Sequence, residues 1–179
     1  MNKIKIYVGR VVVLAIICVL PLANTMAMEI VTPDGKRMDF ESTVSNGKWN
    51  LIMLWAHDCI PCEQQKPMIG RFNKDHSNRG LVVHGLSTDS IANRKKALAL
   101  LSKNLTNYSN YLFNGDNFER QYQAMIGESF VATPTYLVFD KKGELLGSHI
   151  GQITRDMLDN LFDGKLKRAE LVPAADLLR

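Results

Sequence analysis

Two cysteines separated by two residues, Cys59 and Cys62, follow closely on an apolar run that ends at Trp55. If a helix begins at the first cysteine, both sulfur atoms lie in its first turn. There the unpaired backbone N–H groups and the positive end of the helix dipole favour thiolate over thiol. The second cysteine can then close a disulfide with the first and release whatever the first has captured. The same spacing also forms half of many zinc sites, so the rest of the sequence has to distinguish the two.

The start of the chain has the pattern of a secretory signal peptide, residues 1–27. A basic segment precedes an apolar run over 11–20, and small residues lead to an expected cleavage after Ala27. The alternative is an uncleaved membrane anchor, but the apolar run is shorter than the roughly 20 residues of a membrane-spanning helix, which favours removal of the leader. We therefore expect a periplasmic or other extracytoplasmic protein, with one domain over 28–164 and a tail over 165–179.

Removal of this leader changes both the charge and the cysteine count. Three of the 22 Lys and Arg and none of the 18 Asp and Glu lie in the leader, so the mature chain is nearly neutral. The charge therefore gives no reason to expect nucleic acid as a partner. Cys18 leaves with the leader, and the exported domain keeps a single close cysteine pair. Such a pair fits a redox site better than a scaffold stapled by many disulfides.

Strand and helix patterns alternate along the mature sequence, without internal repeats. After an N-terminal hairpin, strands of apolar and β-branched residues are predicted over 49–56, 81–86, 111–113, 135–139 and 144–150. Amphipathic helices are predicted between them, with N-terminal caps at Thr88, Asp89 or Ser90, at Asp116 and at Thr154. This order predicts an α/β sandwich with a mixed sheet.

Both this order and the local motifs resemble the thioredoxin fold, and within it the exported TlpA/ResA/CcmG-like thiol–disulfide oxidoreductases. The motifs are the Cys-Ile-Pro-Cys sequence with Pro67 five residues on, Thr133-Pro134 before a strand, and the turn over 140–143. The resemblance implies a central mixed β-sheet flanked by helices, with an N-terminal β-hairpin. It also implies a cis bond before Pro134 that faces the cysteines, disulfide exchange with exported client proteins, and no cofactor or metal.

In that framework each residue around the motif has an expected role. Cys59 is the nucleophile, exposed at the helix start, and Cys62 is the more buried resolving thiol. Pro61 stiffens the first turn at little cost, because N–H groups are unpaired there in any case. Thr133 offers its backbone to an extended client peptide. Trp55 is expected in the core, with one edge at the site.

Charged residues beside the cysteines bear on how readily a thiolate forms. Asp58 should disfavour the thiolate of the neighbouring sulfur, whereas a protonated His57 would favour it. The alternative for His57 is an exposed loop histidine without a role. Glu63 is interpreted as a complement to the helix dipole, with proton transfer to Cys62 as the alternative.

Two positions depart from the family pattern and leave the reduction potential open. Met53 stands where many thioredoxins bury a carboxylate, and Gln65 stands where the related proteins often have glutamate. Pro61 before the resolving cysteine is shared with reducing thioredoxins, so a reductant is favoured over an oxidase or isomerase. The resemblance implies that electrons come from a membrane thiol transporter of the DsbD or CcdA type, with apocytochromes c among the candidate clients.

Two histidines outside the motif have separate expected roles. His84 falls in a predicted buried strand and is expected to be a satisfied core histidine. His149 supports a second hypothesis, a copper-binding thiol chaperone that uses two cysteines and a distant histidine. Copper chaperones on related folds usually space their cysteines by three residues rather than two, which favours redox exchange.

Overall fold

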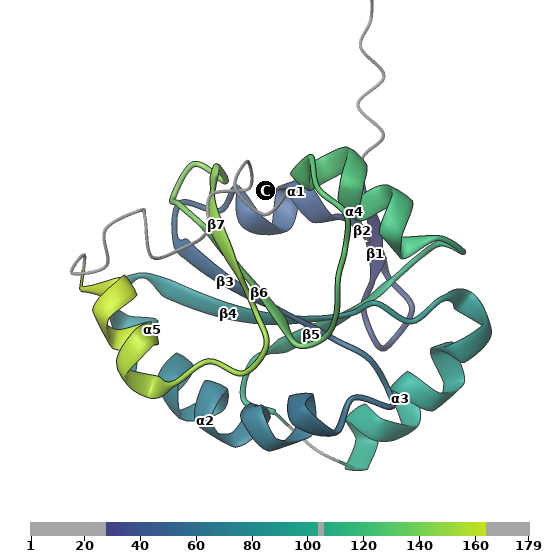
Figure 1. The fold of residues 1–179 in the computed structure, drawn as a ribbon, viewed down its shortest axis with the longest axis horizontal. Coiled ribbons are helices and arrows are strands. Elements are labelled where there is room, and N and C mark those ends of the chain that lie inside the picture. Colours follow the sequence, from purple (N-terminus) through teal and green to yellow (C-terminus); the bar gives the residue numbers. More distant parts are fainter. Residues whose placement is uncertain (1–27, 104–105, 164–179) are drawn as a thin grey trace, which may run out of the picture.

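The computed structural model describes residues 28–103 and 106–163 (Figure 1). The predicted signal peptide over 1–27 and the tail over 165–179 lie outside the described residues, so the domain boundaries stay predictions. No helix within the described ranges has the length and apolar character needed to cross a lipid bilayer.

A mixed sheet of seven strands forms the middle layer of the described chain, in the order β2-β1-β5-β4-β3-β6-β7. The strands are β1 (Glu29–Val31), β2 (Arg37–Asp39), β3 (Trp49–Trp55), β4 (Leu81–Ser87), β5 (Ser109–Phe113), β6 (Thr135–Phe139) and β7 (Leu145–Ile150). β3, β4 and β5 run parallel, and the other neighbours pair antiparallel. The predicted hairpin is β1–β2, and the mixed α/β architecture is confirmed.

Helices cover both faces of this sheet (Figure 1). One face carries α2 (Ile60–His76), α3 (Arg94–Lys103) and α5 (Arg155–Phe162), and the other carries α1 (Phe40–Val44) and α4 (Phe118–Ile126). Short 3₁₀ turns, η1 (Ser77–Arg79) and η2 (Ile91–Asn93), lie in the connections around β4. The layers match the α/β sandwich expected from alternating strands and helices.

The central strand β3 is buried on both faces, as its unbroken apolar sequence predicts. Leu51, Met53 and Trp55 pack in the core beneath α2, and Ile52 and Leu54 pack in the core beneath α1 and α4. None of the five side chains is more than 2% exposed. Burial of each side chain contributes about 1.5–3 kcal/mol to folding, so β3 stabilises the cores on both faces of the sheet.

The caps of the last two helices follow the predicted chemistry, with one change of residue. Asn117, not Asp116, is the cap of α4, and its side chain accepts a hydrogen bond from the Arg120 N–H at 2.9 Å. Thr154 caps α5 as predicted and accepts from the Met157 N–H at 3.2 Å. Asn and Asp cap equally well, so the sequence does not separate two neighbouring candidates.

The helix predicted after β4 starts later than expected. Ser90 precedes the η2 turn without a side-chain cap hydrogen bond, and α3 follows. Thr88 bonds to Trp55 instead, through its N–H to the Trp55 carbonyl at 2.8 Å. Asp89 does not cap because its carboxylate is bound by His57 and Ser87.

His84 is buried as predicted, but the expectation that it is satisfied is wrong. The residue is 6% exposed, its ring lies 5.6 Å from that of Tyr111, and neither ring nitrogen has a hydrogen-bond partner among the described residues. Burial lowers the pKa of His84 to about 4, and the positive charge of Lys48 acts in the same direction. His84 is therefore neutral at neutral pH, which is the form that an apolar core tolerates.

Candidate active site

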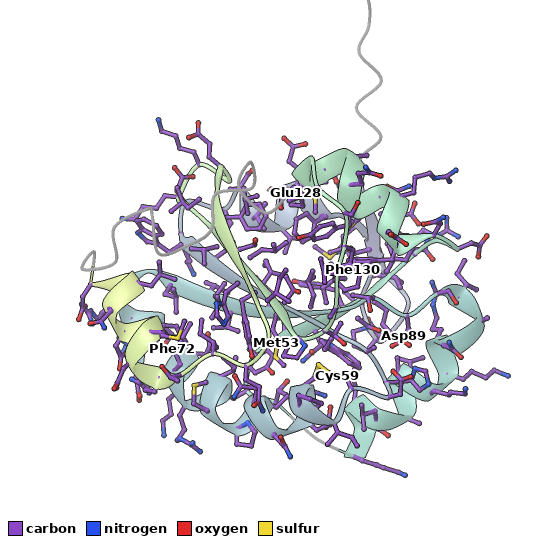
Figure 2. The ribbon with its side chains drawn as sticks, viewed as in Figure 1. Met53, Cys59, Phe72, Asp89, Glu128 and Phe130 are labelled. Carbon is purple, nitrogen blue, oxygen red and sulfur yellow. A yellow bond between two sulfur atoms is a disulfide. The ribbon has the colours of Figure 1, made fainter. Side chains whose placement is uncertain are left out.

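The cysteine motif and the Thr-Pro motif lie at one edge of the sheet because of strand direction. β3 and β4 are parallel, so Trp55 pairs with Ser87 where both strands end. β6 is antiparallel to β3 and begins there, with Thr135 paired to Leu54. Cys59, which follows β3, starts α2 beside this edge (Figure 2).

Cys59 and Cys62 form a disulfide, with their Cα atoms 5.3 Å apart. Cys59 is the N-cap of α2, and its Sγ accepts a hydrogen bond from the Cys62 N–H at 3.2 Å. Cys59 is 8% exposed and Cys62 is 0% exposed, so the predicted order of burial is confirmed. The expectation of a freely exposed Cys59 is wrong, because its sulfur turns toward Cys62 and the first helical turn.

The Thr133–Pro134 bond is cis, as the resemblance implied. Pro134 is buried, Thr133 is half-buried, and the Pro134 carbonyl accepts a hydrogen bond from the Gly151 N–H at 2.8 Å. Since Thr135 pairs with Leu54, the strand register brings Pro134 level with Trp55. The two predicted motifs are therefore brought together at the same end of β3.

Exposed apolar side chains gather on the segments around this edge. Ile60 is 72% exposed, Val131 67% and Ile91 47%. They are the exposed large apolar side chains within residues 28–103 and 106–163. Ile60 lies between the cysteines, Val131 precedes the Thr-Pro motif and Ile91 follows β4. These three residues, here called the apolar rim, lie on segments at the end of the sheet where the redox pair lies, and the exposed Pro61 adjoins Ile60.

His57 is anchored by the carboxylate of Asp89, which follows the end of the neighbouring strand β4. Its Nδ1 lies 2.5 Å from Oδ1 of Asp89, and its backbone N–H donates to Oδ2 of Asp89 at 2.9 Å. Ser87 Oγ also donates to Oδ2, at 2.6 Å, and Asp89 is buried. His57 is therefore a fixed part of the site and not a loose loop residue, while Asp58 is exposed.

Trp55 lies beneath the motif and is 0% exposed, which corrects the expectation of an edge at the site surface. The position is closed because α2 packs over the ring, and the Nζ of Lys66 lies 4.4 Å from the ring centroid. Lys66 also forms an ion pair with Glu63, three residues before it in α2. Glu63 thus has a partner in addition to the helix N-terminus.

Neutral polar groups surround Met53, the position where a carboxylate is common in thioredoxins. The hydroxyl of Tyr108 contacts the Met53 sulfur at 3.9 Å. Gln65 Oε1 accepts hydrogen bonds from the Tyr136 hydroxyl at 3.0 Å and from the Ile153 N–H at 2.9 Å. Burial raises the pKa values of both tyrosines, so both hydroxyls stay protonated at neutral pH.

His149 is not brought into a metal-ligand group with the two cysteines. Its Nε2 lies 3.1 Å from the Gln152 carbonyl oxygen. Across the described part of the chain, no three His, Cys, Asp or Glu side chains gather closely enough to hold a metal ion.

Residues 23–147 match the sequence model of the AhpC/TSA family, which spans well over half of the chain. The chain belongs to the AhpC/TSA family. Together with the thioredoxin-like fold and the Cys59–Cys62 pair, this makes it a thiol–disulfide oxidoreductase. A curated relative, thioredoxin-like protein YneN of Bacillus subtilis, is 24% identical over 119 residues, which cover 66% of this chain and 66% of the relative.

Solved structures share the fold of this AhpC/TSA-family chain. A putative thiol:disulfide interchange protein DsbE from Chlorobium tepidum is 19% identical with a TM-score of 0.62, and the match covers 79% of this chain and 94% of that one. A secreted Mycobacterium tuberculosis disulfide oxidoreductase homologous to Escherichia coli DsbE is 14% identical with a TM-score of 0.58, covering 79% and 98%. At these identities the likeness establishes the fold.

Sequence reasoning missed two residues of this AhpC/TSA-family site, Asp89 and Lys66. The sequence does indicate that Asp89 can lie at the site, because Asp89 follows β4, whose end lies beside the end of β3 in a parallel pair. Lys66 had a weaker signal, since its spacing of four from Cys62 places both on one face of a helix. Neither signal identifies the partner side chain.

Asp89→Asn is expected to destabilise the folded protein by about 1–3 kcal/mol, because a buried carboxylate that accepts three hydrogen bonds loses its charge. The free energy of unfolding measured by denaturant titration tests this. Asp58→Asn is the matched control, since Asp58 is an exposed carboxylate next to His57, and should stay within about 0.5 kcal/mol of wild type. Equal stabilities of the two variants would contradict the anchoring role of Asp89.

Proposed function

We propose that this AhpC/TSA-family protein is an exported protein-disulfide reductase. Cys59 and Cys62 would carry electrons to disulfides in exported client proteins, with apocytochromes c among the candidates. The observation that carries the proposal is the redox pair at the start of α2, at the same end of the sheet as the cis Thr133–Pro134 bond and the apolar rim.

The chemistry proceeds in two exchange steps. The Cys59 thiolate attacks one sulfur of a client disulfide, so a Cys59–client bond forms and the other client sulfur leaves with the electron pair. The Cys62 thiolate then attacks the Cys59 sulfur, which closes the Cys59–Cys62 disulfide and frees the second client sulfur as a thiolate. The client gains two electrons, and the protein is left oxidised.

Client binding is supported by the surface around the pair. The apolar rim, Ile60, Ile91 and Val131, offers contact to an extended apolar segment of a client. Thr133 lies at the start of the path into β6, where its backbone can pair with such a segment as an added strand. Both features favour unfolded or flexible client chains over compact ones.

An extracytoplasmic location and a membrane electron donor complete the proposal. The leader pattern over 1–27 supports export, and one structural neighbour is described as a secreted disulfide oxidoreductase. An exported reductant needs electrons from across the membrane, which a thiol transporter of the DsbD or CcdA type would supply. The alternatives are a disulfide oxidase, an isomerase and a copper chaperone. The reduction potential separates the first two from the reductase, and a copper titration tests the third.

The reduction potential is expected near that of thioredoxin, about −270 mV, when the protein is equilibrated with glutathione or dithiothreitol buffers. Pro61 and the carboxylate of Asp58 beside the nucleophile both favour the reducing direction. A potential near −120 mV would identify an oxidase and overturn the proposed direction. Pro61→His, at a position that lines no core, should shift the potential toward the oxidising end while leaving the fold intact.

A further inference from the structure

Lys66 is a buried lysine in the first half of α2, four residues after Cys62. Its side chain is 5% exposed, and it lies on α2 one turn after Cys62, on the same helix face. The ammonium group is held between the ring of Trp55, with the centroid 4.4 Å away, and the carboxylate of Glu63. Lysine is seldom buried without a reason, because its charge loses hydration there.

The second exchange step creates a need for such a charge. Cys62 is 0% exposed, and it must become a thiolate before it attacks the Cys59 sulfur. Burial away from water disfavours that anion unless a positive group lies close by. β3 contributes Met53 and Trp55 beneath the site, and neither side chain carries a charge.

The titratable groups on the elements packed here differ in burial and charge. They are Glu63, Lys66 and Arg71 on α2, Lys103 at the end of α3, Tyr108 just before β5, and Tyr136 on β6. The pKa values of both tyrosines are raised by burial, and the side chains of Arg71 and Lys103 point to solvent as exposed residues. Among these described groups, Lys66 is the cation that is buried with Cys62.

A cavity of about 600 Å³ opens between α2 and the segment before β5, and both Glu63 and Lys66 line it. A space of this size admits several water molecules. It therefore connects the buried ion pair of Glu63 and Lys66 with solvent.

We propose that Lys66 is a positioning residue for resolution of the mixed disulfide, where its ammonium group, held by Glu63 and Trp55, stabilises the attacking thiolate of Cys62. The proton of Cys62 passes to solvent, the Cys62–Cys59 bond forms, and the departing sulfur takes the electron pair of the broken bond. This inference rests on the exchange chemistry of the proposed function, but not on its direction or on the identity of the client.

The test follows the two steps separately in the full chain. Reduced protein is mixed with one equivalent of dithiobis(nitrobenzoate), and absorbance reports two releases of thionitrobenzoate, the first by Cys59 attack and the second by Cys62. Lys66→Met, which keeps the length and fills the same space, is expected to slow the second release about tenfold at neutral pH. A tenfold change in rate corresponds to one pH unit, so the pH profile of the second release should shift by about one unit to higher pH. The first release should stay within about twofold of wild type.

Matched variants separate a charge effect from a packing effect. Lys66→Arg keeps the cation and should restore most of the second release, whereas Lys74→Met, an exposed lysine of the same helix, should change neither release. If Lys66→Met matches Lys74→Met in rate and pH dependence, the proposal is wrong. Lys66→Gln replaces Lys66→Met if the latter does not fold. Failure of the second release in wild type would instead overturn the exchange chemistry itself.

Discussion

Cys62→Ser is expected to arrest exchange at the mixed disulfide, with clients held covalently on Cys59. In the wild type the resolving thiol lies in the first turn of α2, close enough to close a disulfide with Cys59. Such a placed intramolecular thiol has an effective concentration of about 10⁵ M or more, far above any free thiol in solution. Its loss should slow release of the client by on the order of a thousandfold or more.

Covalent complexes of the tagged Cys62→Ser protein, isolated from the extracytoplasmic fraction and separated without reductant, provide the measurement. Cys59→Ser is the matched control, because it retains one cysteine of the pair but lacks the attacking group. It should form no such complexes and should lose disulfide reductase activity. Complexes that accumulate on Cys59→Ser instead would reverse the two roles, and complexes on neither variant would rule out the exchange mechanism.

Acid is expected to destabilise the protein by up to about 3 kcal/mol through His84 alone. In the unfolded chain this histidine takes up its proton near pH 6.5, whereas burial in the fold lowers its pKa to about 4. The unfolded state therefore binds more protons across this interval. Stability falls as the pH drops from 6.5 toward 4 and the His84 contribution levels off below that.

Denaturant titrations at a series of pH values test this expectation. His84→Leu removes the titrating group from a site where no described residue forms a hydrogen bond with its ring, so the variant should lose much of the slope between pH 6.5 and 4. His149→Gln, a change on β7 away from that core, should keep the slope. If the wild type and His84→Leu lose stability equally over this interval, protonation of the buried His84 is not the cause of the loss.

Much of the fold could be predicted because local patterns carry it. The unbroken apolar sequence before the motif is confirmed as β3, buried on both faces, and the Thr154 cap begins α5 as expected. The Cys59 and Cys62 spacing is a property of one helical turn, so no long-range contact is needed to foresee the disulfide.

Predictions failed where a polar side chain has several possible hydrogen-bond partners. The sequence makes Asp89 one of three candidates for a helix cap, yet its carboxylate bonds to His57, 32 residues earlier in the chain. His84 was assigned a hydrogen bond that the packed core does not supply. Both outcomes depend on what the neighbouring strand presents, which a single segment does not encode.

The sequence by itself determined the chemistry of this protein: a cysteine pair at the start of a helix, after a buried strand, in a chain with a leader pattern. Only the tertiary structure decided the surroundings of that pair. The parallel register of β3 and β4 brings Asp89 to His57, and packing of α2 on the sheet buries Lys66 against Trp55. Spacing along the chain sets which residues share a helical turn, whereas register and packing set which distant side chains meet.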